Sequence, residues 1–213
     1  MSQQNNERNA PYGGFHLAGE LPPENTELTH VGPGTPGGNY MRRFWHPVAL
    51  SSELTDLPLA LRILDEDLVL FRDLSGRIGL LHRHCSHRGV SLEYGIPVKE
   101  GIRCCYHGWL FDVDGKILET PGEPLNSKLK DNRYHGAYHA FEYKGLIFAY
   151  LGAPEKKPEF PMLDTYELAD NRMIPYSISH PCNWLQVFEN MMDPVHAVFL
   201  HTRLAGTDFT EAW

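Results

Sequence analysis

Two short stretches, RHCSHRG at 83–89 and RCCYHGW at 103–109, each hold cysteine and histidine within a few residues. The side chains on offer are Cys85 with His87, and Cys104 or Cys105 with His107. Thiolate sulfur and neutral imidazole nitrogen bind transition metals, so two such loops on a rigid scaffold make a preformed site. Sixteen residues separate His87 from Cys104, enough chain for one loop to return beside the other. The two stretches therefore predict a metal centre held between two loops.

Length and composition limit the class of protein. The chain has 213 residues, enough for one or two domains, and its 42% hydrophobic and 22% charged residues are typical of a soluble globular protein. Its 19 basic and 27 acidic side chains give a net charge of −8, which argues against a nucleic-acid or anionic-membrane partner. The polar start MSQQNNERNA lacks a secretory pattern, and four cysteines make a poor disulfide framework. We therefore expect a cytoplasmic protein.

The character of the sequence changes along the chain. Residues 1–40 are polar and rich in Gly and Pro, which predicts a poorly ordered arm or a surface wrap. Residues 41–153 read as short strands joined by tight turns, with turns expected at DED (65–67), DG and KG. Residues 154–213 begin with a proline-rich linker, continue with a strand-like MIPYSISH at 173–180, and then turn helical.

The two loops admit three interpretations. The cysteines could be ordinary buried residues and the histidines ordinary surface ones. A zinc site of two cysteines and two histidines is the second, but zinc sites usually pair cysteine with cysteine and histidine with histidine. Here each loop offers one of each. This distribution suits a two-iron, two-sulfide cluster in which one iron takes both cysteines and the other both histidines.

The sequence CSHRG followed by RCCYHGWLFDVDGKILETPGE resembles the Rieske domain of bacterial ring-hydroxylating oxygenases, usually C-x-H-R-G and R-C-P-Y-H-G-W. The resemblance implies that Cys104 is the ligand and that Cys105 stands where the family has proline. Respiratory-chain Rieske proteins are less similar, because they carry an additional disulfide-bonded cysteine in each loop. Donors around the cluster are expected from Arg88 and from the backbone around Gly89 and Gly108. Trp109 is expected either to cover the cluster or simply to pack in the core.

A second motif lies in NWLQVFENMMDPVHAVFLH at 183–201. Asn183, followed by Gln186, resembles a capping box and predicts a helix start, and Asp193 with Pro194 predicts a second helical segment. His196 and His201 are five residues apart, about 140° around an ideal helix. They can share one ion only if the helix is distorted, or ends, between them.

Rieske oxygenases follow their Rieske domain with N-x2-D-x2-H-x4-H, and this chain fills the pattern with Asn190, Asp193, His196 and His201. The resemblance implies that His196 and His201 bind a mononuclear non-haem iron in a two-histidine, one-carboxylate site. It implies that Asp193 joins His196 to His107 of a neighbouring subunit, and it assigns Asp193 and Asn190 to the catalytic machinery.

The family's third iron ligand is an aspartate far downstream, beyond Trp213. Asp208 and Glu211 are the carboxylates nearest the motif, and neither fits that pattern. We therefore expect residues 1–213 to be the N-terminal portion of a longer oxygenase.

The resemblance gives a fold and a function as expectations. The fold class is α+β: an all-β Rieske domain of antiparallel sheets, then the start of an α+β, helix-grip-like catalytic domain. The opening MRRFWHPVALSSEL at 41–54 resembles the phthalate-dioxygenase branch, whose oxygenases are assemblies of α subunits alone, and implies a homotrimer. The implied function is a terminal oxygenase that takes NAD(P)H electrons through a separate reductase or ferredoxin. The implied substrates are dioxygen and an aromatic carboxylate or aryl ether. A Rieske ferredoxin, an electron carrier without a substrate, is the alternative.

Overall fold

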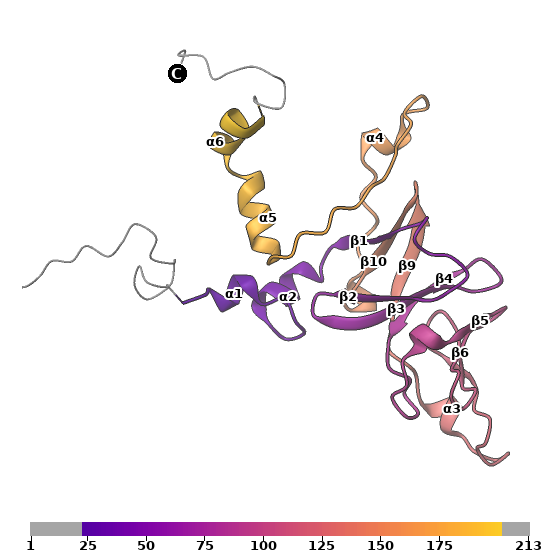
Figure 1. Ribbon diagram of the computed structural model, residues 1–213. Coiled ribbons are helices and arrows are strands. Elements are labelled where there is room, and N and C mark those ends of the chain that lie inside the picture. Colours follow the sequence, from indigo (N-terminus) through magenta and orange to yellow (C-terminus); the bar gives the residue numbers. More distant parts are fainter. Residues whose placement is uncertain (1–22, 202–213) are drawn as a thin grey trace, which may run out of the picture.

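Residues 23–201 are described by a computed structural model, in which two antiparallel sheets form the body of the chain (Figure 1). The larger sheet has the order β1-β10-β9-β4-β3-β2. Its strands are β1 (Trp45–Leu50), β2 (Leu59–Ile63), β3 (Glu66–Arg72), β4 (Ile78–His82), β9 (Ala137–Tyr143) and β10 (Leu146–Tyr150). The smaller sheet has the order β5-β6-β7-β8, with β5 (Ile96–Val98), β6 (Gly101–Arg103), β7 (Leu110–Phe111) and β8 (Ile117–Glu119). The predicted antiparallel β domain is confirmed.

Two-residue turns set the register of the larger sheet. Leu64 and Asp65 have φ of 47° and 65°, and Lys144 and Gly145 have φ of 50° and 81°. Positive φ at both turn residues matches the right-handed twist of the flanking strands. The KG turn lies where the sequence predicts it, whereas the first turn begins one residue before the predicted DED.

Two apolar clusters form the core. One packs against the larger sheet, and its buried members are Leu54, Leu68, Leu70, Leu80, Ile147, Ala149 and Leu151. The other joins β3 and β4 to the smaller sheet, and its buried members are Val69, Phe71, Leu81, Cys85, Leu92, Ile102, Cys104, Trp109, Phe111 and Ile117. The loops with the candidate ligands are therefore part of the contact between the sheets.

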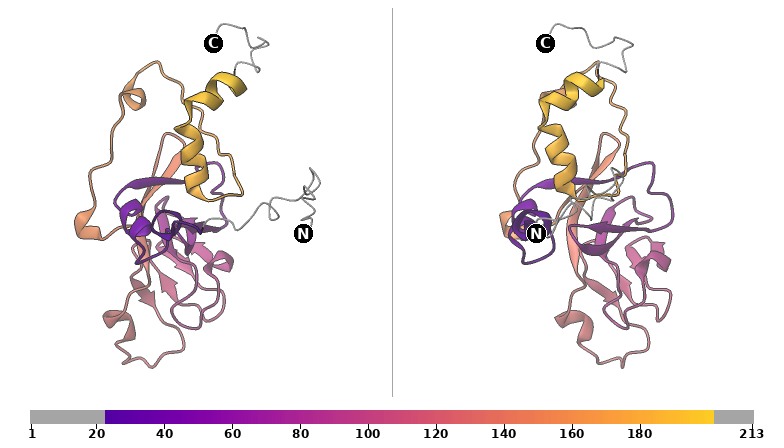
Figure 2. Two further views of the ribbon diagram at one scale, coloured as in Figure 1. Left: turned by 90° about the vertical axis from the view of Figure 1, so that its left-hand side faces the viewer. Right: turned by 60° about the vertical axis from the view of Figure 1, so that its left-hand side comes forward.

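The helices are short. They are α1 (Thr26–Thr29), α2 (Pro36–Met41), η2 (Leu92–Tyr94), α3 (Leu129–Asn132), η3 (Pro154–Lys156), α4 (Asp164–Glu167), α5 (Trp184–Met191), α6 (Pro194–His196) and η4 (Ala197–His201). Figure 2 shows α5 and α6 projecting away from the sheets. In the described part of the chain, no helix is long and apolar enough to cross a membrane.

Two expectations differ from the structure. The arm is not irregular throughout, because α1 and α2 form within it; the Thr35 hydroxyl accepts from the Gly38 N–H, and Pro36 occupies the first turn. Residues 173–180 run without regular structure, since no strand of the described chain pairs with them. The predicted α+β class is confirmed, while the boundaries at 40/41 and 153/154 and the helix-grip continuation stay predictions.

A mostly buried carboxylate, that of Glu66, joins the arm to the larger sheet. Glu66 Oε1 lies 2.7 Å from Arg42 Nη2, and Oε2 accepts from the Tyr138 hydroxyl at 2.6 Å. The Glu66 and Arg42 side chains are only 12% and 11% exposed. Burial, and then the Glu66 carboxylate, raise the pKa of Tyr138, so the phenol remains a donor. The contacts of Glu66 therefore depend on its charge.

Glu66→Gln is expected to lower the free energy of unfolding by about 3 kcal/mol, because it leaves the Arg42 guanidinium buried without its counter-charge. Glu142→Gln is the matched control, since Glu142 pairs with Arg72 at 2.7 Å with side chains 36% and 32% exposed. Its loss should stay below about 1 kcal/mol. Urea unfolding of both variants measures the difference, and equal losses would contradict the role of burial at Glu66.

Candidate metal centres

The first cysteine loop closes on itself. The Cys85 N–H donates to the Val90 carbonyl at 2.9 Å, and the Gly89 N–H donates to the Cys85 carbonyl at 2.8 Å. Gly89 has φ of 75°, a left-handed conformation that glycine adopts without strain. The His84 ring Nδ1 lies 3.0 Å from the Gly89 carbonyl oxygen and supports the turn from outside.

The second loop repeats this closure. The Cys104 N–H donates to the Trp109 carbonyl at 2.8 Å, and the Gly108 N–H donates to the Cys104 carbonyl at 3.0 Å. Gly108 has φ of 72°, like its counterpart. The position that matches Cys85 is therefore Cys104, and Cys105 is exposed.

The two matching thiols are buried together. Cys85 and Cys104 are 4% and 3% exposed, and their sulfurs lie within hydrogen-bonding reach of each other. Burial raises the pKa of Cys85 to about 11, with the neighbouring Cys104 adding to the rise, although the backbone N–H groups of His87 and Arg88 oppose it. Two thiolates in this apolar pocket require a positive partner, as an iron pair would be, because a coordinated metal deprotonates a thiol.

The two histidines lie together on the outer side of the loops. The His87 and His107 ring centroids are 4.7 Å apart, and His87 stacks on Trp109 at 4.6 Å. His87 Nδ1 is buried without a hydrogen-bond partner, a free ligand atom. Burial, and then the charges of His107 and Arg88, lower the pKa of His87 and favour the neutral form that binds metal. Paired thiols inside and paired imidazoles outside fit a two-iron cluster of the Rieske type.

One supporting residue escaped the sequence analysis. Arg103 Nη1 donates to the Gly108 carbonyl at 2.8 Å and to Glu119 Oε2 at 2.8 Å, so it fastens the second loop to β8. Its place directly before Cys104 was the available signal, but a lone arginine carries no pattern that assigns it a partner. Trp109, expected to cover the cluster or to pack in the core, is 3% exposed and lies under His87.

The second motif forms three consecutive helical segments. Asn183 caps α5, accepting from the Leu185 N–H at 3.1 Å, so the predicted helix start is confirmed. Asp193 caps α6 with Pro194 in its first turn, as expected. The chain then widens into the π-helical turn η4, whose i→i+5 spacing brings residues five apart over one another.

The π-turn brings two predicted iron ligands together. The His196 and His201 rings lie 5.4 Å apart. Asp193 Oδ1 accepts from the Val195 and His196 N–H groups at 2.9 and 3.3 Å, while Oδ2 lies 3.9 Å from His196 Nδ1. The distortion expected between the histidines is present, and the residues fit two histidine ligands with an adjacent carboxylate.

The remaining candidates lie apart from this pair. Asn190 is exposed in the last turn of α5, and its carbonyl accepts from the Asp193 N–H at 3.4 Å. Asp208 and Glu211 fall outside the described residues. Within 23–201, no three His, Cys, Asp or Glu side chains are spaced to hold one metal ion. The four cluster candidates would hold two irons, which need a wider spacing than one ion does.

The two candidate centres lie at opposite ends of the folded molecule. Figures 1 and 2 show α6 at one end, and α3 with the smaller sheet at the other, in every view. The loop with Cys104 and His107 follows β6 directly. The cluster candidates and the iron candidates of one chain are therefore far from each other.

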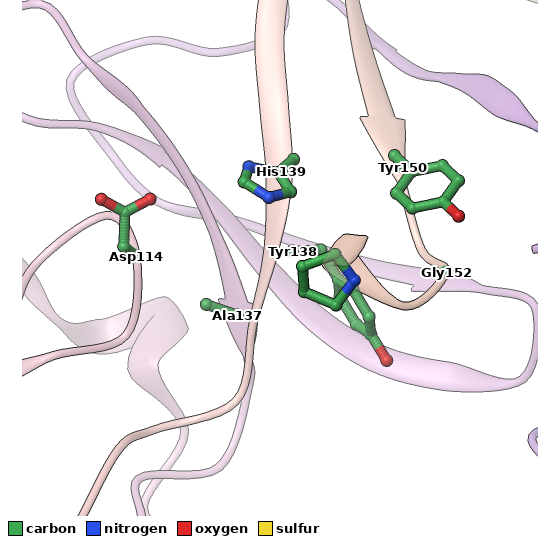
Figure 3. Close-up of a pocket in the computed structure, with 7 residues that line it drawn as sticks. Asp114, Ala137, Tyr138, His139, Tyr150 and Gly152 are labelled. Atoms are coloured by element: carbon green, nitrogen blue, oxygen red, sulfur yellow. The ribbon is translucent and has the colours of Figure 1, made fainter. Parts of the chain in front are cut away.

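One cavity borders the first Rieske loop, and another lies against β9. A cavity of about 290 Å³ borders His87 and Trp109, together with Glu123, Arg133 and Tyr134. A smaller one of about 180 Å³, drawn in Figure 3, lies between Asp114 on its loop and Tyr138 and His139 on β9. None of the candidate ligands lines the smaller cavity.

Comparison with known proteins agrees with this geometry. Residues 44–130 match the family described as Rieske [2Fe-2S] domain. This chain contains a Rieske [2Fe-2S] domain. The Rieske domain and the oxygenase relatives support two cofactors, a Rieske [2Fe-2S] cluster and a mononuclear iron.

Several relatives of this chain are named as oxygenase subunits. It is 55% identical over 202 residues to the tert-butanol monooxygenase / tert-amyl alcohol desaturase oxygenase subunit of Aquincola tertiaricarbonis, covering 92% of this chain and 43% of the relative. It is 46% identical over 211 residues to phenoxybenzoate dioxygenase subunit alpha of Ectopseudomonas oleovorans, covering 92% and 51%. The crystal structure of dicamba monooxygenase bound to 3,6-dichlorosalicylic acid superposes with a TM-score of 0.62 at 26% identity, covering 77% and 48%. The chain spans about half the length of the curated relatives it matches.

Cys104→Ser is expected to abolish the visible absorption of the Rieske cluster, because it removes one of the two buried thiols predicted to bind it. Cys105→Ser and Cys105→Pro should keep that absorption, since the Cys105 side chain is exposed. Absorption spectra and iron-to-protein ratios of the purified variants measure both outcomes. Bleaching by Cys105→Ser with an intact Cys104→Ser spectrum would mean that the ligand is one residue further along.

Proposed function

We propose that this chain is part of the terminal oxygenase component of a multicomponent Rieske oxygenase. The observation that carries the proposal is the π-turn pairing of His196 with His201, beside Asp193, in a chain that also holds the Rieske loops. An electron carrier needs only the loops. A second site for a metal, with a carboxylate at one of its histidines, serves an enzyme that uses the electrons itself.

In this proposal Cys85 and Cys104 bind the inner iron of the cluster, and His87 and His107 bind the outer one. The bound cluster would supply one-electron storage, and the mononuclear iron would supply activation of dioxygen. The chain contributes an apolar pocket that keeps water from the sulfurs, and the His87 and Arg88 N–H groups directed at Cys85. Such donors raise the reduction potential by stabilising the added negative charge.

His196 and His201 bind the mononuclear iron in the proposal, with Asn190 and Asp193 as the adjoining catalytic residues. Asp193 Oδ2 lies 3.9 Å from His196 Nδ1, and a carboxylate on this side of the ring favours the tautomer with the proton on Nδ1, which leaves Nε2 for the metal. The same carboxylate accepts from His107 of a neighbouring subunit. Support comes from the opposite placement of the two centres in one chain, which favours a route between subunits.

The division of the chain follows from these sites. We assign residues 1–40 to an N-terminal arm, 41–153 to the Rieske domain, and 154–213 to the linker and the beginning of the iron-binding domain. The match to the Rieske family at 44–130 and the sheets from Trp45 to Tyr150 support the middle unit. The likeness to relatives about twice as long supports a further part of that last domain.

The proposed substrates are dioxygen and an aromatic carboxylate or aryl ether. The phenoxybenzoate dioxygenase relative supports this class, because phenoxybenzoate is both. A small tertiary alcohol is the second candidate, favoured by the 55% identity to the tert-butanol monooxygenase subunit. Substrate-dependent oxygen uptake by the full-length protein, with phenoxybenzoate and tert-butanol compared side by side, separates the two.

The proposed partners are a reductase or ferredoxin that passes on electrons from NAD(P)H, and two further copies of the chain in a homotrimer. The oxygenase relatives support the electron donor. The trimer follows from the resemblance of residues 41–54 to the phthalate-dioxygenase branch, and a bridge through Asp193 requires contact between subunits. We place the protein in the cytoplasm, where reduced thiols such as the exposed Cys105 and Cys182 persist.

The full-length protein, reconstituted with iron(II) and sulfide, is expected to hold about three irons per chain, two in the cluster and one at the histidine pair. His196→Ala with His201→Ala should reduce this to about two while the red-brown cluster absorption stays unchanged, because the cluster lies at the other end of the chain. Metal analysis together with absorption measures both. About two irons per chain in the parent protein would favour the electron-carrier alternative.

Asp193→Asn is expected to stop electron transfer to the iron in the full-length protein. Asn caps a helix about as well as Asp, so the cap to Val195 and His196 survives. The amide, however, presents an N–H donor where the imidazole N–H of His196 needs an acceptor. The cluster should still be reduced by dithionite, while product from one turnover of the pre-reduced enzyme collapses. Near-normal product would leave Asp193 as a helix cap alone.

A further inference from the structure

The arm before the Rieske domain packs as one tight unit. A Cβ added at Gly37 would lie 2.8 Å from the His30 carbonyl oxygen and 2.9 Å from that of Glu27. At Gly38 it would overlap the Gly32 carbonyl oxygen. The glycines of GPGTPGG therefore let α2 lie against the backbone of α1 without side chains between them.

One end of this unit is fixed to the Rieske domain. Arg42, directly after α2, donates to the carbonyls of Val31 and Leu64 at 2.8 Å each, in addition to pairing with Glu66. His46 Nε2 lies 2.8 Å from the Met41 carbonyl oxygen and holds the end of α2 to β1. These contacts join the arm to the turn between β2 and β3, to Glu66 on β3, and to β1 at the edge of the sheet.

The other end is bonded to the start of α5. Trp184 Nε1 donates to the Leu28 carbonyl at 3.0 Å, and Asn183 Nδ2 donates to the Thr29 carbonyl at 2.9 Å. Asn183 uses both ends of its amide, because its Oδ1 also caps α5 at the Leu185 N–H. A serine or aspartate would cap equally well but could not donate to the arm.

The stretch of chain that links the Rieske domain to α5 is long. From β10 to α5 the chain runs through residues 151–183, which are mostly exposed and contain only the short η3 and α4. Figures 1 and 2 show this linker looping away from the sheets, while the foot of α5 stands beside α1 and α2. The arm is thus a second, shorter connection between the Rieske domain and α5.

We propose that residues 25–42 are a strap that positions α5, and with it the segments carrying His196 and His201, relative to the Rieske domain. Asn183 and Trp184 are positioning residues in this device, acting through α5 on the histidine pair. The proposal rests on the proposed function only for the statement that these histidines bind iron; the strap itself rests on the hydrogen bonds and packing above.

The first experiment removes the strap's bonds and leaves the helix. In the full-length protein, Asn183→Ser keeps the cap of α5, and Trp184→Phe keeps an aromatic ring beside Phe188. Backbone amides of 185–192 should exchange with deuterium about tenfold faster in this double variant, since two hydrogen bonds to the arm are lost. The cluster absorption and potential should not change. Asn171→Ser is the matched control, because its Nδ2 donates within the linker, to the Thr165 carbonyl, at 2.7 Å.

The second experiment loosens the strap away from α5. Gly37→Ala must push α1 off α2 and should speed exchange at 185–192 without touching that helix. If the strap works as one unit, releasing it at either place releases it entirely. Gly37→Ala combined with the double variant should therefore increase exchange at 185–192 little beyond the double variant alone. Independent effects on exchange would instead add. Single-turnover product per reduced cluster should fall in all three, with no change at Asn171→Ser.

Unchanged exchange at 185–192 in the double variant, or fully additive effects with Gly37→Ala, would overturn the strap. A parent protein that binds no third iron would instead contradict the proposed function, and the exchange measurements would still decide the strap.

Discussion

The hydrogen bond from each cysteine N–H to the carbonyl five residues on is the constraint on which the Rieske end of the chain depends. It closes both loops with a left-handed glycine, at Gly89 and Gly108, and it turns both thiols into the apolar contact between the sheets. The smaller sheet therefore packs on the larger one through side chains that surround Cys85 and Cys104. Metal binding and the packing of the two sheets are coupled, since ligand placement and core formation use the same residues.

The cysteine side of the two loops is apolar and buried, whereas the histidine side faces solvent. The sulfurs lie in a pocket that disfavours negative charge, as the raised pKa of Cys85 indicates, while His107 is exposed. Because an imidazole can bind a metal through one nitrogen while its other edge faces solvent, the histidine side is where an electron would pass to another protein or subunit in the proposed enzyme. The same loop closure that buries the thiols, with the histidine two or three residues on, turns His87 and His107 outward.

The sequence correctly predicted the features that depend on residues close together in the chain. The KG turn, the caps at Asn183 and Asp193 and the paired strands follow from turn chemistry, capping and alternation within a few residues. The helices α1 and α2 were missed because Gly and Pro predict irregular chain, and what stabilises them is contact with Arg42 and β1. The strand expected at 173–180 needs a partner that the described chain does not offer. The five-residue histidine spacing required a distortion, but nothing local in the sequence identified it as a π-turn.

The separation of the two centres gives the arm its importance. With the cluster loops at one end and the histidine pair at the other, electrons in the proposed enzyme leave one chain's His107 and enter the next chain's Asp193. Each chain must then hold its Rieske loops and its histidine pair in a fixed relative orientation. A change of that orientation in one subunit would misplace its contacts with both neighbouring subunits. An exposed linker of some thirty residues cannot fix this orientation, since flexible chain leaves many relative orientations accessible. A strap bonded to Glu66 at one end and to Asn183 and Trp184 at the other can, and its glycines are what allow it to be short and stiff.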